Sequence, residues 1–313
     1  KILLWGQEMI GKQYMLAGRL NGKDLIHSGY VSPDLFHDLI NKSAMDNNLK
    51  QELRERFNPD GSLLRRQQLR MLELLEAVDL VCKKYDIPYW LSSGTLIGAV
   101  RHQGFIPWDD DLDIEMLRED YLRLMKVLPE ELPDKFVLQT HETDPNYISN
   151  YAKVRDMNSY LEETNAYDRI WKYQGVYIDI FSLERIPFSL AWIAGHMQGQ
   201  IYNQLNNQSL KQETMLRRIR LIYRFNSKIG FPILRFLAKF IPGKKLRHSF
   251  GTAYFKPRYS EDIFPLSEME FEGKKFPVPH NSDALLRKIY GDYMKLPDLD
   301  SIHPHYSKLE IYK

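Results

Sequence analysis

The chain has little of several features that would assign it to a class at once. It contains one cysteine, Cys82, in 313 residues, so an internal disulfide framework is excluded. Cys82 falls within a helical pattern, where we expect a packed and reduced thiol. The net charge is only +2, which gives no indication of general nucleic-acid binding. With 43% hydrophobic residues, the composition is that of a folded protein rather than a disordered one.

Long apolar runs and targeting segments are also missing. The best run, residues 229–241, contains Arg235 and Lys239 and is shorter than the roughly 20 residues that span a bilayer. The first residues lack the basic, apolar and small-residue succession of a secretory signal. We therefore expect a cytoplasmic protein, with the inner face of the membrane as a second location. The chain begins with Lys1, which is compatible with a start inside a longer product.

Turns and changes in periodicity predict three regions. Residues 1–60 form an accessory segment of unknown role, which opens on a strand-like KILLWGQEMIG without the glycine-rich nucleotide-binding fingerprint. Residues 32–57 are compatible with helix, and FNPDGS is a turn that ends this segment. Residues 61–187 are predicted to be the catalytic core. Residues 188–313 are predicted to be a mostly helical C-terminal region.

Helical and strand-like periods alternate in the core. We predict helices at residues 63–85, 95–101 and 118–127, and strands at residues 89–91, 108–116, 136–140, 151–155, 160–163 and 175–181. These elements indicate an α+β fold in which a small mixed β-sheet is flanked by helices, followed by a helical C-terminal extension.

An acidic cluster dominates the sequence LSSGTLIGAVRHQGFIPWDDDLDIEM. Its carboxylates, Asp109, Asp110, Asp111 and Asp113, lie within five positions and repel one another unless a cation relieves them. If this segment is a strand, Asp109, Asp111 and Asp113 share one face, whereas Asp110 points to the other. Such hard oxygen ligands suit a magnesium ion that also binds phosphate, with manganese as a second candidate.

Two further features complete the chemistry of phosphoryl-type transfer. Asp179 is the one charged residue of the apolar strand GVYIDIF, where it should face a cation. The turn at residues 92–94 opens a short helix and can present backbone N–H groups to an anion. In this interpretation Asp111 and Asp113 hold the metal, and Asp179 completes the site or accepts a hydroxyl proton. Phosphate contacts are assigned to Ser93, Gly94, Thr95, Arg101, Lys153 and Arg155.

The long motif GTLIGAVRHQGFIPWDDDLDI resembles the signature of the LicD family. The similarity continues through YAKVRD, GVYIDIF, and the later FPVP and YGDYMKLP elements, so it covers roughly residues 65–185 and 270–305. Members of this family are phosphotransferases of the nucleotidyltransferase superfamily and are similar to the fukutin group. The N-terminal 60 residues and residues 190–265 lie outside the resemblance.

The resemblance implies magnesium-dependent transfer of a phosphocholine-like group. The donor would be CDP-linked, such as CDP-choline, and the acceptor a sugar hydroxyl of a cell-surface glycan or its lipid-linked precursor, of the lipopolysaccharide, teichoic acid or capsule type. Carried onto this sequence, the glycine turn of the superfamily falls at Gly94 and Thr95, and its paired acids at Asp111 and Asp113. Asp109 matches a further acidic position of the family, and Asp179 is assigned as the third carboxylate.

Two other functions remain open from the sequence. A nucleotidyltransferase that releases pyrophosphate would use the same carboxylates. A catalytically inactive relative that binds glycan would not need them, so the intact Asp111, Asp113 and Asp179 count against it.

Two segments outside the core carry separate hypotheses. Residues 210–241 are helical and basic, which suggests either peripheral contact with an anionic membrane or a solvated basic face. The solvated face is the more common case. His303 and His305 have strand-like spacing, but with Pro304 between them a metal site there has little support.

Overall fold

The computed structural model describes residues 2–10, 13–20, 23–28, 47–207, 209–242 and 244–312. The chain divides into two compact units, Lys1–Glu52 and Leu53–Lys313. In the first unit, strands β1 (Ile2–Ile10), β2 (Gln13–Leu20) and β3 (Lys23–Ser28) form an antiparallel sheet in sequence order. Helix α2 (Asn47–Phe57) matches the end of the predicted 32–57 helix, whose earlier part lies outside the described residues.

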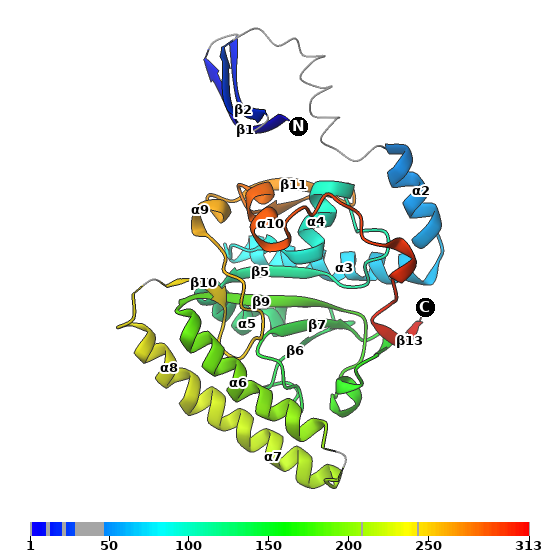
Figure 1. Ribbon diagram of the computed structural model, residues 1–313. Helices are drawn as coiled ribbons and strands as arrows, with labels where there is room; N and C mark the ends of the chain where they lie inside the picture. Colours follow the sequence, from blue (N-terminus) through cyan, green and yellow to red (C-terminus); the bar gives the residue numbers. More distant parts are fainter. Residues whose placement is uncertain are drawn as a thin grey trace. The chain divides into compact units, whose positions relative to one another are not determined.

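A six-stranded mixed sheet forms the centre of the second unit (Figure 1). Its order is β4 (Trp90–Leu91), β5 (Asp113–Leu117), β9 (Tyr177–Ile186), β7 (Ala152–Asp156) and β6 (Phe136–Gln139), and β10 (Lys245–His248) also pairs with β9. The β5–β9 pair is parallel, whereas β4–β5, β7–β9, β6–β7 and β10–β9 are antiparallel. The predicted α+β fold with a small mixed sheet is therefore confirmed.

Helices α3 (Leu63–Lys84) and α5 (Arg118–Glu131) pack against this sheet. Both are amphipathic, and the main hydrophobic core includes their buried leucines together with Ile114, Ile178 and Ile180 of the central strands. Ser62 caps α3, since its side chain accepts a hydrogen bond from the Arg65 backbone N–H. The apolar side chains of β5 and β9 are thus committed to the core, and the alternate side chains of these strands are free for other contacts.

The remaining elements surround the sheet. Helix α4 (Ser93–His102) follows β4, and η1 (Tyr167–Ile170) follows β8 (Ser159–Glu163), which pairs with β13 (Tyr306–Ile311). The hairpin of β11 (Ser267–Phe271) and β12 (Lys274–Val278) packs near α4 and β4. The short elements α9 (Ser260–Ile263), α10 (Ser282–Tyr290) and η3 (Leu299–Ser301) lie in the C-terminal part.

The predicted helical extension consists of α6 (Phe188–Leu205), α7 (Gln212–Phe225), the π-helical turn η2 (Asn226–Gly230) and α8 (Phe231–Ala238). In Figure 1, α7 and α8 continue into one another as one rod beside α6, with which both make contact. Two separate hydrophobic clusters hold this layer, one around Ile201 and Ile219 and one around Ala194 and Phe231. None of the helices in the described residues has the length and apolarity needed to cross a membrane.

Candidate active site

Three charged side chains lie in one row across adjacent strands. Asp113 on β5 is the register partner of Asp179 on β9, and Asp179 is in turn the partner of Lys153 on β7. Lys153 Nζ lies 2.8 Å from Asp179 Oδ1, and both residues are buried. The prediction that Asp179 faces a cation is confirmed, and that cation is Lys153.

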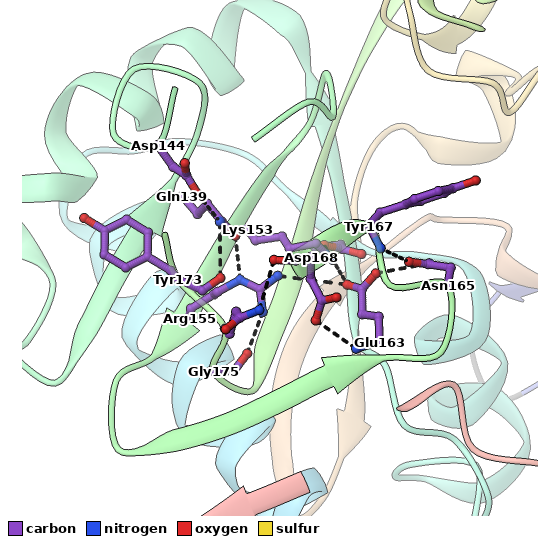
Figure 2. A network of polar contacts seen from close by, with 12 residues as sticks. Gln139, Asp144, Lys153, Arg155, Glu163, Asn165, Tyr167, Asp168, Tyr173 and Gly175 are labelled. Carbon is purple, nitrogen blue, oxygen red and sulfur yellow. Dashed lines mark hydrogen bonds and ion pairs between the residues drawn. The ribbon is translucent and has the colours of Figure 1, made fainter. Parts of the chain in front are cut away.

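Lys153 is held on several sides (Figure 2). Its Nζ lies 3.9 Å from a carboxylate oxygen of Glu163. It also lies 3.3 Å from the centre of the Tyr177 ring. The ammonium therefore contacts two carboxylates and an aromatic face, which hold it in place. Both of these carboxylates belong to the protein. The predicted contact of Lys153 with a phosphate of the substrate therefore stays a prediction.

Arg155 is fully buried in the neighbouring network (Figure 2). Its Nε donates to Gln139 Oε1 at 2.5 Å and its Nη1 to the Gly175 carbonyl at 2.7 Å. Gln139 in turn donates to Asp144 at 2.8 Å. The structure thus places Arg155 in the support of β6 and β7, and its proposed contact with substrate is untested.

The acidic cluster precedes its strand rather than forming it. We expected a strand from residue 108, but β5 begins only at Asp113, so that expectation was wrong. The reason is that the preceding carbonyl groups accept hydrogen bonds from α3 side chains: Gln67 donates to Asp110 O at 2.8 Å and Gln68 to Asp109 O at 2.9 Å. Backbone groups bound in this way are not available to a β-ladder.

The carboxylate of Asp110 is bound by His305, and the expectation that it points away from the other acids stays a prediction. One of its carboxylate oxygens lies 2.7 Å from His305 Nδ1, and the other accepts the His305 backbone N–H at 2.7 Å. This contact joins the acidic loop to the segment before β13. It also accounts for His305, which acts here as a carboxylate partner.

The carboxylates of Asp109, Asp111 and Asp113 repel one another at this edge of the sheet. The pKa values of all three are raised, first because burial disfavours the charged form and then because acidic neighbours add repulsion. The pKa of Asp179 is raised to about 6 by burial, against the lowering effect of Lys153. Burial and mutual repulsion therefore make it costly for all of these carboxylates to be ionised at once.

The start of α4 lies directly against this cluster. A Cβ at Gly94 would stand only 2.7 Å from Asp109 Oδ2, so the carboxylate rests on the bare backbone of this glycine. Ser93 adopts a left-handed conformation with φ of 49°. A non-glycine residue in that region is strained, and such strain is frequent at functional sites.

Thr95 connects α4 to the acidic strand. Its buried hydroxyl accepts a hydrogen bond from the Asp113 backbone N–H at 2.9 Å, and the Ser92 N–H donates to the Asp113 carbonyl at 3.0 Å. Ser93 and Gly94 remain partly exposed beside the carboxylates. In the structure, then, Thr95 fixes Asp113, and Ser93 and Gly94 are the accessible part of the predicted phosphate turn.

Arg101 is also buried near the cluster. Its Nη1 donates to the Tyr293 carbonyl at 2.7 Å, and its guanidinium lies 5.9 Å from the Trp108 ring centre. Burial lowers the pKa of Arg101, against the raising effect of the Asp109 carboxylate. Contacts with Tyr293 and Trp108 thus hold the Arg101 guanidinium near Asp109.

Sequence reasoning missed a second buried charge cluster, around Glu115. Its carboxylate lies 2.7 Å from Arg258 Nη2 and 3.1 Å from His248 Nε2, and it accepts the Trp90 indole N–H at 3.2 Å. Burial raises its pKa, but Arg258 and His248 outweigh that effect, so the net pKa is lowered. The sequence offered one signal for this cluster. Glu115 is an acid in an otherwise apolar stretch after Asp113, and a buried acid needs a partner.

An aromatic cluster borders the carboxylates. The Phe181 ring centre lies 4.5 Å from that of Tyr151 and 5.9 Å from that of Tyr254. Tyr254 is 58% exposed, yet its pKa is raised to about 12 by partial burial and by the nearby Asp113, Asp179 and Asp111. Tyr254 was not predicted, because only its position after β10 brings it to this edge.

The donor chemistry of the cluster fits a hard divalent cation, since it consists of carboxylates whose mutual repulsion a cation would relieve. In the described ranges, no three side chains from His, Cys, Asp and Glu are positioned as a ready-made metal-binding group. The predicted ligands Asp109, Asp111, Asp113 and Asp179 therefore remain a proposal.

This geometry can be compared with known proteins. A family model described as "LicD/FKTN/FKRP, nucleotidyltransferase domain" matches residues 86–200, which contain the acidic cluster, Lys153 and Asp179. A lipopolysaccharide cholinephosphotransferase LicD from Haemophilus influenzae is 30% identical over 262 residues, which are 78% of this chain and 96% of that protein. The chain belongs to the LicD family. It is a phosphotransferase, and the resemblance predicted from the motif is confirmed.

Shorter matches connect the chain to the fukutin group. A ribitol-5-phosphate transferase FKTN from Mus musculus is 40% identical over 52 residues, 17% of this chain and 11% of that protein. A ribitol 5-phosphate transferase FKRP from Homo sapiens is 38% identical over 68 residues, 21% of this chain and 12% of that protein. These relatives differ in the group that their names say they transfer, so family membership alone does not specify it.

Proposed function

We propose that the chain transfers a phosphocholine-like group from a CDP-linked donor to a sugar hydroxyl of a cell-surface glycan or its precursor. The extent of the match to the Haemophilus influenzae cholinephosphotransferase supports this choice, since it covers nearly the whole of that protein. In the reaction, the sugar oxygen forms a bond to the phosphorus of the substituted phosphate. The bond from that phosphorus to the CMP oxygen breaks, and CMP leaves.

The observation that carries the proposal is the row of Asp113, Asp179 and Lys153 beside the start of α4. Transfer of this kind depends on positioning and on stabilisation of charge rather than on covalent catalysis by the protein. Ser93 and Gly94 offer backbone N–H groups to phosphate at a helix N-terminus. Asp179, which Lys153 holds in place, is our candidate acceptor for the hydroxyl proton.

A magnesium ion is part of the proposal. Asp109, Asp111, Asp113 and Asp179 would hold it, and when bound it would polarise phosphoryl oxygens and offset their charge. The support is the gathering of these carboxylates at one edge of the sheet, where burial first and acidic neighbours second raise the pKa of each group. Manganese, with the same preference for oxygen ligands, is the expected substitute.

The aromatic cluster of Tyr151, Phe181 and Tyr254 supports a cationic head group. Aromatic faces attract quaternary ammonium groups, and the nearby carboxylates add further attraction. Glycerol and ribitol carry no positive charge and would gain nothing from either contact. This arrangement favours choline over an uncharged alcohol in the donor.

The proposal is tested by incubating the purified chain with magnesium, an acceptor glycan and either CDP-choline, CDP-glycerol or CDP-ribitol. We expect CMP release and labelled glycan with CDP-choline, and much less with the two uncharged donors. Release of pyrophosphate from CTP would instead identify a nucleotidyltransferase. Absence of CMP from every donor, with folded protein and several acceptors present, would contradict the proposed function.

A further inference from the structure

The rod formed by α7, η2 and α8 exposes an unusual row of large apolar side chains. Leu221, Phe225, Ile229, Ile233 and Leu237 follow one another at four-residue intervals, and Phe236 and Phe240 adjoin the last of them. Each of these seven side chains, which we call the α7–α8 stripe, belongs to a residue that is between 43% and 70% exposed. A single exposed apolar residue is ordinary, but a continuous row marks an interaction surface.

The geometry of the rod keeps this row on one side. On an ideal α-helix, residues four positions apart drift by about 40° around the axis. The π-helical turn Asn226–Gly230 takes more residues per turn, which reduces that drift in the middle of the row. The opposite side of the rod, which includes Met215, Ile219, Phe231 and Leu234, is buried in the two hydrophobic clusters of the helical layer.

Basic residues accompany the stripe. Residues 211–245 contain ten lysines and arginines but only one acid, Glu213. Arg217 and Arg218 lie one turn before Leu221, and Arg224 and Lys228 directly precede Phe225 and Ile229; all four basic residues are exposed. Exposed aromatic and aliphatic side chains with flanking basic residues are complementary to a bilayer whose head groups are anionic.

We propose that the α7–α8 stripe docks on the surface of an anionic lipid membrane, with the rod lying in the plane of the interface. The apolar side chains enter the boundary between head groups and acyl chains, and the basic residues contact lipid phosphates. A second copy of the chain could cover apolar side chains, but the high positive charge of this face would then oppose itself. The proposal does not depend on the reaction, because neither donor nor acceptor is needed for binding.

Vesicle co-sedimentation of the full chain tests the proposal without substrate. We expect binding to vesicles of phosphatidylcholine mixed with phosphatidylglycerol, little binding to phosphatidylcholine alone, and weaker binding at high salt. The triple variant Phe225→Ser, Ile229→Ser, Ile233→Ser should bind at least about tenfold more weakly. The matched control Leu69→Ser, Leu80→Ser, Met157→Ser changes exposed apolar residues outside the rod and should bind like the parent.

The charge contribution is measured with a second pair of variants. Arg224→Gln, Lys228→Gln should weaken binding by about fivefold per charge, while Lys275→Gln, Lys295→Gln, which lie outside the rod, should have little effect. Circular dichroism and urea unfolding verify that each variant folds. The proposal would be overturned by equal binding to neutral and anionic vesicles, or by equal effects of the rod and control variants. It would also be overturned if the parent bound no vesicles but formed a dimer in ultracentrifugation that the Ser variant dissociates.

Discussion

Lys153 Nζ and Asp179 Oδ1 lie 2.8 Å apart on adjacent strands, and both side chains are buried in the sheet face that carries the acidic cluster. Each charge depends on the other, because removal of one partner leaves an uncompensated buried charge. The loss of either side chain should therefore lower the stability of the protein as well as its activity.

Lys153→Met should lower the free energy of unfolding by about 3–5 kcal/mol, the usual cost of breaking a buried ion pair from one side. The double variant Lys153→Met, Asp179→Asn should recover a large part of this loss, because the remaining carboxylate is also neutralised. Urea unfolding measures both. Strictly additive losses in the double variant would show that the two side chains do not compensate each other.

The variant Thr95→Val tests the hydrogen bond that positions Asp113. Valine keeps the shape but cannot accept the hydrogen bond from the Asp113 N–H, so we expect a loss of about 1–3 kcal/mol in unfolding free energy together with a lower kcat. Thr95→Ser keeps the acceptor and should restore both quantities. If serine fails to restore kcat, the hydroxyl group does not support activity by positioning Asp113.

The His305–Asp110 contact should make stability depend on pH above neutrality. The pKa of His305 is raised to about 9, chiefly by its hydrogen bond with Asp110 and further by the charges of Asp110, Asp111 and Glu163. A raised pKa stabilises the folded state fully below the unfolded value of about 6.5, and this contribution is lost as the pH rises through about 9.

The measurement is the difference in Tm between the parent and His305→Gln. We expect the difference to be largest near about pH 6 and to shrink towards about pH 10. A difference that grows with pH would contradict the assigned charge state of His305.

Tyr254 should influence which head group is transferred. Tyr254→Ala removes an exposed aromatic face beside the carboxylates and should raise KM for CDP-choline by about three- to tenfold, with little change for CDP-glycerol. Tyr254→Phe keeps the face and should behave like the parent, while Tyr312→Ala, which removes an exposed tyrosine outside the site, is the control. Equal effects on both donors would remove Tyr254 from head-group recognition.

Local pattern predicted most elements of the core. The helix expected at residues 63–85 is α3 (Leu63–Lys84), and the isolated charge in GVYIDIF correctly indicated that Asp179 has a cationic partner. Both inferences depend only on periodicity and on the cost of burying a charge. The start of β5 was missed, because Gln67 and Gln68 bind the carbonyl groups before it and no local pattern reveals that contact.

Partners far apart in the sequence account for what could not be predicted at the site. His305 lies 195 positions from Asp110, and Arg258 lies 143 positions from Glu115. The sequence indicates that a buried charge needs a partner, but only the fold selects which one. Arg155 was predicted to contact phosphate, but its guanidinium donates hydrogen bonds to Gln139 and Gly175 instead. The sequence did not reveal these partners either.

The central claim, that the partly exposed acids of β5 and its preceding loop support transfer, is tested most directly by Asp111→Asn, Asp113→Asn. This variant should lose at least about a hundredfold in labelled phosphocholine transfer and lose its dependence on magnesium. It should unfold at a urea concentration no lower than the parent, because two mutually repelling carboxylates are removed. Glu268→Gln, Glu270→Gln on the β11 surface is the control and should remain active. Full turnover with unchanged magnesium dependence in the Asp111, Asp113 variant would contradict the account.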